Sequence, residues 1–137
     1  MATMISRIVY TTIDRPWRDV YAFISYIQKM PLWAAGLASG LRQDGEDWIA
    51  SGPLGDVRVH FAKPNDLGVV DHVVTLPDGI DVYNALRVTP NGDGAEVTFT
   101  VLRLPGTTDA DHERDAAAVM ADLKMLKYIL EKSEGTV

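Results

Sequence analysis

The chain has 137 residues, of which 47% are hydrophobic, enough to build one domain spanning residues 1–137 without covalent staples. It contains no cysteine, which excludes disulfides, thiolate nucleophiles and cysteine metal sites, and we expect a reducing, cytoplasmic location. Its net charge of −6, without a cluster of Lys or Arg, argues against nucleic-acid partners. No apolar stretch is long enough for membrane insertion.

The N-terminal segment is typical of one strand followed by two short helices. Ile5 to Ile13 alternates with the period of a strand, and Asp14-Arg15-Pro16 ends it, with the proline suited to a first helical turn. Met30-Pro31 then interrupts the helix, and residues 32–35 can form one more short turn before Gly36. The apolar residues that define the first helical face are Val20, Phe23, Ile24 and Ile27.

Glycine, proline, asparagine and aspartate punctuate the middle of the chain at spacings typical of hairpins. Together with the first strand, the extended runs between these turns predict seven strands. The six further runs are Leu41–Gln43, Trp48–Ser51, Asp56–Lys63, Gly68–Leu76, Ile80–Thr89 and Ala95–Leu104.

A long amphipathic helix over residues 108–132 ends the fold. Thr107 or Thr108 can cap it, acidic residues populate its first turn, and lysines populate its other end. Its apolar stripe steps by three and four residues through His112, Ala116, Val119, Leu123, Leu126 and Leu130. We therefore predict an α+β fold in which a curved antiparallel sheet wraps around this helix and leaves a hollow between them.

This order of elements resembles the START/SRPBCC helix-grip superfamily, and specifically its bacterial polyketide cyclase/dehydrase-like members. The resemblance is carried by the Ile13-Asp14-Arg15-Pro16 segment followed by Val20, Trp33 after the proline, the run from Gly68 to His72, and the ending from Asp122 to Lys127. It implies a deep apolar cavity between helix and sheet and no fixed cofactor. The superfamily includes lipid carriers, hormone receptors, aromatase/cyclases, oxygenase subunits and chaperone activators.

Strand alternation predicts which side chains face that cavity. The inward sets bring two polar side chains, His72 and Asn84, among apolar ones, and place Arg103 at the inner face near one end. A buried Arg103 or Asn84 indicates a polar ligand group or an internal ion pair. With the helical stripe, the expected apolar lining is Val57, Val59, Phe61, Val70, Val74, Leu86, Phe99, Val119 and Leu123.

His72 is the candidate for chemistry, because an imidazole can act as acid, base or hydrogen-bond donor, although a histidine satisfied within the core is the alternative. We expect the neighbouring Asp71 to face solvent and to pair with Lys or Arg. His112 either gates a rim or completes the core end. Trp33 either stacks a ligand at the mouth or plugs the core. Trp17 and Trp48 are assigned to packing or surface, and no metal spacing is present.

The first hypothesis is therefore a carrier or sensor that binds a small hydrophobic molecule, lipid or polyketide-like, between the sheet and the C-terminal helix. The second is a cyclase or dehydratase-like enzyme in which His72 is the acid or base. A chaperone-activator-like interaction module is the third. The sequence leaves open whether the protein is an enzyme and whether it forms a homodimer.

Overall fold

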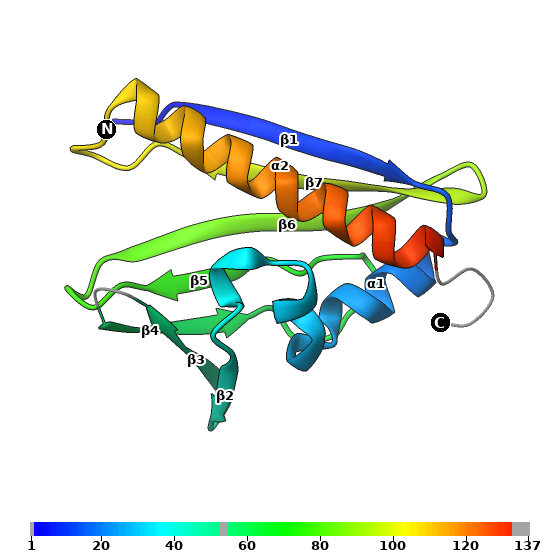
Figure 1. Ribbon diagram of the computed structural model, residues 1–137, viewed down its shortest axis with the longest axis horizontal. Coiled ribbons are helices and arrows are strands. Elements are labelled where there is room, and N and C mark those ends of the chain that lie inside the picture. Colours follow the sequence, from blue (N-terminus) through cyan, green and yellow to red (C-terminus); the bar gives the residue numbers. More distant parts are fainter. Residues whose placement is uncertain (1, 53–54, 133–137) are drawn as a thin grey trace.

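The computed structural model describes residues 2–52 and 55–132 (Figure 1). Strand β1 (Ser6–Ile13) leads into helix α1 (Trp17–Ser25) and two 3-10 helices, η1 (Ile27–Leu32) and η2 (Ala35–Leu37). The remaining strands are β2 (Leu41–Asp44), β3 (Asp47–Gly52), β4 (Gly55–Phe61), β5 (His72–Thr75), β6 (Asp81–Asn91) and β7 (Gly94–Leu102). Helix α2 (Asp109–Lys132) follows them.

The strands form one curved antiparallel sheet in the order β1-β7-β6-β5-β4-β3-β2. Helix α2 runs alongside β1 and β7, α1 lies near the C-terminal end of α2, and the 3-10 helices, in cyan, lie in the middle of the view (Figure 1). The predicted α+β helix-grip architecture, with seven strands, short helices after the first strand and a long C-terminal helix, is confirmed.

The core lies between α2, α1 and the concave face of the sheet. The predicted stripe of α2 is buried, and its Leu123, Leu126 and Leu130 have no exposed surface, while Val119 is only partly buried. From α1, Val20 and Ile24 fill the same layer. Burying such a stripe supplies most of the stability of a long helix, because helical propensity alone is weak.

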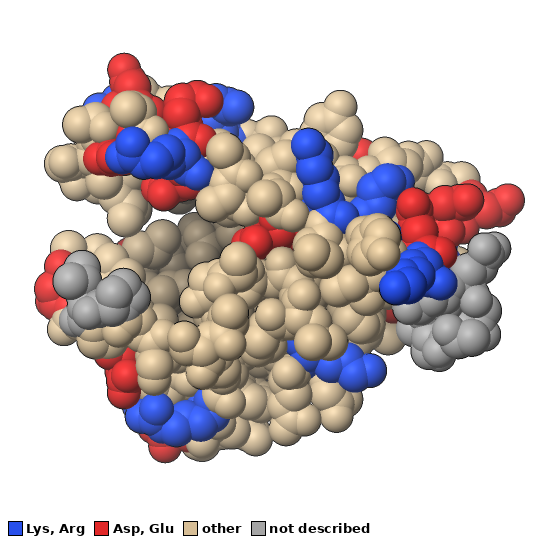
Figure 2. Space-filling view, viewed as in Figure 1, with Lys and Arg blue, Asp and Glu red and all other residues tan. Residues whose placement is uncertain are grey.

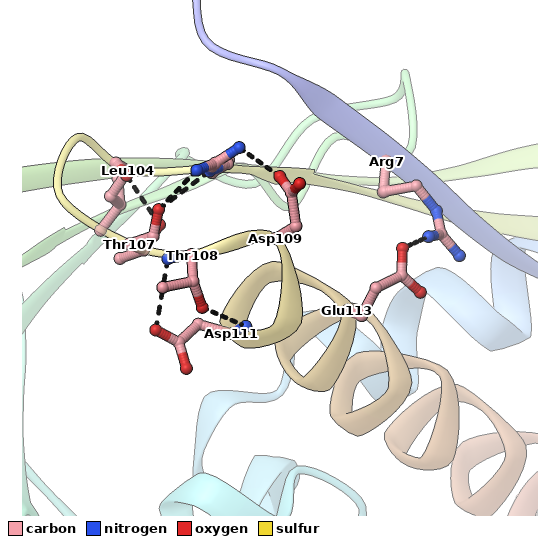
Figure 3. Close-up of polar contacts among 8 residues, drawn as sticks. Arg7, Leu104, Thr107, Thr108, Asp109, Asp111 and Glu113 are labelled. Atoms are coloured by element: carbon pink, nitrogen blue, oxygen red, sulfur yellow. Dashed lines mark hydrogen bonds and ion pairs between the residues drawn. The ribbon is translucent and has the colours of Figure 1, made fainter.

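Both ends of α2 are attached to the rest of the chain by polar contacts. At its start, Thr108 caps the helix by accepting the Asp111 N–H at 3.1 Å, and Arg7 of β1 pairs with Glu113 (Figure 3). At its end, Lys127 Nζ donates to the Thr12 carbonyl at 2.6 Å, and Arg15 donates to the Leu130 carbonyl at 2.8 Å. Cations at the last carbonyls complement the helix dipole.

The N-terminal helices differ in detail from the prediction. Helix α1 ends at Ser25, and Met30-Pro31 lies inside η1, not at a break after it. Proline has no N–H to donate, and the hydrogen bonds of η1 run on either side of it, from Lys29 N to the Tyr26 carbonyl and from Trp33 N to the Met30 carbonyl.

The predicted strand over residues 68–76 is shortened to β5, because residues 62–71 form a loop organised by Asn65. The Asn65 amide donates to the Lys63 and Val69 carbonyls at 2.9 Å, and its oxygen accepts from Leu67 N and Val69 N. Gly68 has φ +74°, and a Cβ there would lie 1.9 Å from the Val88 carbonyl oxygen. Only glycine fits this approach.

Candidate functional site

A cavity of about 220 Å³ lies between the concave face of the sheet, the 3-10 helices and α2. Figure 2 shows the molecule hollowed at the left of the view, beneath the first half of α2. We call it the inner cavity. Its lining is mostly apolar and consists of Met30, Trp33, Ala34, Gly36, Leu37, Val59, Phe61, His72, Val74, Asn84, Leu86, Phe99, Val119 and Asp122.

Strand register explains why these side chains meet. Residues directly opposite each other in antiparallel strands share one face of the sheet. Phe61 is paired with His72, and His72 with Asn84, so this row crosses β4, β5 and β6 on the concave face. The adjacent row joins Val59 to Val74. The predicted inward orientation of these strands therefore agrees with the register.

His72 is a half-buried imidazole with both ring nitrogens engaged. Its Nδ1 lies 3.0 Å from the Val70 carbonyl, which can only accept, so Nδ1 carries the proton. The lone pair of Nε2 then accepts from the Asn84 amide at 3.4 Å. Burial lowers the pKa of His72 below its ordinary 6.5, against the opposing effect of the Val70 carbonyl. The ring is therefore neutral at pH 7, its Nε2 lone pair is taken by the Asn84 amide, and it does not present to the cavity the donor that the sequence also allowed.

Aromatic rings hold this imidazole from two sides. The Phe61 ring lies 5.0 Å from that of His72, centroid to centroid, and the Phe99 ring lies at 6.1 Å in an edge-on arrangement. Both separations are typical of favourable aromatic pairs. Such packing fixes the orientation of the His72–Asn84 pair, which presents a defined polar group on an otherwise apolar surface.

Asp71 differs from the expectation that it faces solvent. Its side chain lies on the opposite side of the chain from His72, but it is only 4% exposed. The carboxylate accepts from Leu86 N at 3.0 Å, Tyr83 Oη at 2.6 Å and Arg87 at 2.9 Å. The predicted pairing with an arginine is thus present, and burial follows because this carboxylate takes a backbone hydrogen bond where β5 has not yet begun.

Asp122 was not predicted as a site residue. It lies three residues after Val119 on α2, at the edge of the apolar stripe, and its Oδ1 accepts the Ala35 N–H at 3.1 Å. Burial raises the pKa of this carboxyl above its ordinary 3.8, only partly offset by that hydrogen bond. The signal in the sequence was a charged residue directly flanking the buried face of a helix.

Trp33 is 5% exposed and contributes to both the core and the lining of the inner cavity. Its indole Nε1 is buried and has no hydrogen-bond partner in the part of the chain that the structure describes. An unsatisfied buried donor destabilises a fold by about 1–3 kcal/mol. The ring thus packs the core and also forms a wall of the cavity, where stacking on a ligand stays a prediction.

Several predicted lining residues lie elsewhere. Leu123 is part of the core, and Val57 lines a separate hollow beside Arg42 and Arg58. Arg103 and His112 lie near the start of α2: Arg103 pairs with Asp109 and donates to the Thr107 carbonyl, while buried His112 donates through Nε2 to the Val101 carbonyl at 3.0 Å. Figure 3 shows the surrounding capping contacts. The structure thus satisfies both residues without a ligand.

A second hollow, of about 360 Å³, lies on the far side of Phe61 and is called the outer hollow here. Trp48 lines it, which is compatible with the expected packing or surface role, and it pairs with Val59 and therefore shares the concave face. Phe61 lines both hollows, whereas Val70 lines only this one. The full lining is Tyr21, Ser25, Ile27, Gln43, Glu46, Trp48, His60, Phe61, Ala62, Lys63, Pro64, Val69 and Val70.

Residues 2–52 and 55–132 contain no group of three or more His, Asp or Glu placed to hold a metal ion. Within the same ranges, no helix combines the length and apolar character needed to span a bilayer.

Comparison by sequence finds no matching family model and no matching curated protein. Several solved structures nevertheless have a similar fold. A START superfamily protein from Mycobacterium smegmatis superposes with a TM-score of 0.69 at 11% identity, over 96% of this chain and 99% of the other. The protein XoxI from Bacillus cereus gives a TM-score of 0.73 at 12% identity, over 92% and 95% of the two chains.

DynU16, a protein in the dynemicin biosynthetic locus, superposes with a TM-score of 0.70 at 12% identity, over 96% of this chain but 49% of its own length. At such low identities these likenesses define the fold and not the activity. The chain therefore has the START/SRPBCC helix-grip fold, as its sequence suggested.

Proposed function

We propose that the protein binds a small hydrophobic molecule in the inner cavity, as a carrier or sensor. The observation that carries this proposal is a mostly apolar lining that contains an oriented polar pair, His72 and Asn84, with Asp122 at its edge. A few fixed polar groups in an apolar concavity are typical of small-molecule sites. Asn84 donates one of its two amide N–H groups to the His72 lone pair. Its oxygen and its other N–H therefore stay available for a ligand hydroxyl or carbonyl.

The volume of the inner cavity limits the size of the ligand that it can hold. At about 220 Å³ it is smaller than the roughly 300–1,000 Å³ usual for drug-sized ligands, but larger than an apolar cavity of about 150 Å³ that holds benzene. The part of the ligand held here is therefore the size of one or two rings, or a short chain. The nearby carboxylate of Asp122 disfavours a ligand carboxylate at this end.

The test uses 2-naphthol, a neutral two-ring molecule with one hydroxyl group, in calorimetric titrations. Val74→Trp fills the inner cavity and should abolish saturable binding. Val73→Trp is the matched control, because the next residue of β5 faces the other side of the sheet and should leave binding intact. Equal binding by the two variants would contradict the proposal.

A second candidate function is a polyketide cyclase or dehydratase-like reaction with His72 as the base. A neutral imidazole in the cavity wall favours it, because a general base must be unprotonated at the working pH; a substrate that draws the Asn84 amide away would leave the Nε2 lone pair free. If His72 only orients a ligand, His72→Gln should weaken binding about fivefold, the value of one hydrogen bond of about 1 kcal/mol. If it is the base, affinity should persist while turnover of a carbonyl substrate falls on the order of a hundredfold or more.

A further inference from the structure

We propose that the outer hollow is the second half of the ligand site, and that the ligand is an amphipathic monocarboxylate. Its largely apolar end, with room for one hydroxyl or carbonyl at Asn84, fills the inner cavity, and its carboxylate lies in the outer hollow beside Lys63 and Tyr21. This inference rests on the proposed function of the inner cavity. It is carried by the position of Phe61 and by the polar groups of the outer hollow.

Phe61 is the partition between the two hollows. It is the last residue of β4, its ring contacts His72 on the inner side, and it also lines the outer hollow. The side chain is partly buried, with empty volume on both sides. Rotation of Phe61 about χ1 to another staggered rotamer would exchange its contact with His72 for an opening that joins the hollows, without a movement of the sheet.

Lys63 places in the outer hollow an ammonium group that has no carboxylate or aromatic partner among the described residues. Among the described lysines, only Lys63 and Lys124 have neither a carboxylate partner nor an aromatic ring beneath the ammonium. Lys124 lies on α2 outside both hollows, whereas Lys63 lines the outer one. A lysine ammonium provides three donors for a carboxylate.

Tyr21 supplies a second donor to the same hollow. Its hydroxyl accepts the Asn65 N–H at 2.9 Å, and no described residue accepts the hydroxyl proton in return. That proton can therefore be donated to a carboxylate held by Lys63. Asn65, whose side chain organises the loop after β4, fixes the position of the hydroxyl.

The remaining charges limit the ligand to a single negative charge. Glu46 lines the outer hollow without an ion-pair partner among the described residues, and His60 is held by Asp47 at 2.7 Å. The carboxylate of Glu46 repels an anion, and so does the overall charge of −6. Phosphates and dicarboxylates are therefore disfavoured relative to a monocarboxylate.

The probes are 6-phenylhexanoate and 6-phenyl-1-hexanol, which share a shape and differ in charge, titrated calorimetrically at low and moderate salt. Lys63→Met should weaken binding of the acid about tenfold, as expected for a lost charge-assisted hydrogen bond, and leave the alcohol unchanged. Lys124→Met is the matched control and should change neither. Glu46→Gln should strengthen binding of the acid only, because it removes a like charge.

Val74→Trp should weaken the binding of 6-phenylhexanoate as well, because the phenyl end of this probe occupies the inner cavity. If the acid binds this variant as it binds the unchanged protein, the two hollows are independent and the inference is overturned. It is also overturned if Lys63→Met affects acid and alcohol equally, or neither, while 2-naphthol still requires an open inner cavity. If 2-naphthol binding is insensitive to Val74→Trp, the proposed function itself fails.

Discussion

Replacing Asp71 by alanine tests whether its buried carboxylate holds β5 against β6. The change leaves the Leu86 N–H buried without its acceptor, which destabilises the fold by about 1–3 kcal/mol. The lost ion pair adds about 1 kcal/mol or less, because the Arg87 side chain is 54% exposed. We expect a total loss of about 2–3 kcal/mol in the free energy of unfolding, or roughly 10 °C in Tm.

The pH dependence of this loss follows from the pKa of Asp71. Burial alone would raise that pKa, but the hydrogen bonds from Arg87, Tyr83 and Leu86 N outweigh it, and the pKa lies below the ordinary 3.8. A carboxyl whose pKa is lowered in the folded state stabilises the fold above the unfolded pKa and loses that contribution below it. The difference between Asp71→Ala and the unchanged protein should therefore narrow as the pH falls below 3.8.

Urea unfolding followed by tryptophan fluorescence measures the effect, with Asp44→Ala as the matched control. Asp44 also pairs with an arginine, Arg58, but its side chain is 60% exposed, and no buried N–H of the described residues donates to it. We expect Asp44→Ala to cost about 0.5 kcal/mol or less. Equal losses in the two variants would refute the structural role of the buried carboxylate.

Three further substitutions test other parts of the fold and the site. Gly68→Ala should prevent stable folding, because its Cβ would lie 1.9 Å from the Val88 carbonyl oxygen; a variant melting within a few degrees of the unchanged protein would contradict this. Leu123→Ala should cost about 2–5 kcal/mol in urea unfolding, since the side chain is fully buried. Asp122→Asn should raise Tm at pH 7, because burial of the charged carboxylate raises its pKa and penalises the fold above that pKa. The gain should disappear below pH 3.8, where both variants are uncharged, and a gain that persists there would refute the assignment.

The architecture could be predicted because its elements are specified by local periodicity. The stripe from His112 to Leu130 repeats at helical spacing, and alternation in β4 and β6 placed Phe61 and Asn84 on the concave face. Such patterns require only the type of each residue and its spacing from the next apolar residue along the chain. They therefore predict which face a residue occupies, and the register places those faces together as expected.

The site was less predictable, because it depends on contacts between segments that are distant in sequence. Asp122 accepts a hydrogen bond from the backbone of Ala35, and Trp48 and Tyr21 line the same outer hollow; no periodicity of the sequence relates the members of either pair. The burial of Asp71 arises because Asn65 folds the preceding loop and shortens β5. From the sequence alone, a polar side chain such as Asp71, which accepts a backbone hydrogen bond in place of a carbonyl, cannot be told from a surface residue.

The attachment of α2 at both ends has a consequence for the kinetics of binding. Arg7 and Glu113 secure its first turns, and Lys127 and Arg15 secure its last, so tilting the helix away from the sheet requires breaking contacts at both ends together. The segment over residues 27–37, which also walls the inner cavity, consists of short 3-10 turns; Met30 and Trp33 pack in the core, and the Ala35–Asp122 hydrogen bond joins the segment to α2. We therefore expect the association rate of a ligand to be governed by the opening of this segment, with the lining residues setting how long the ligand stays.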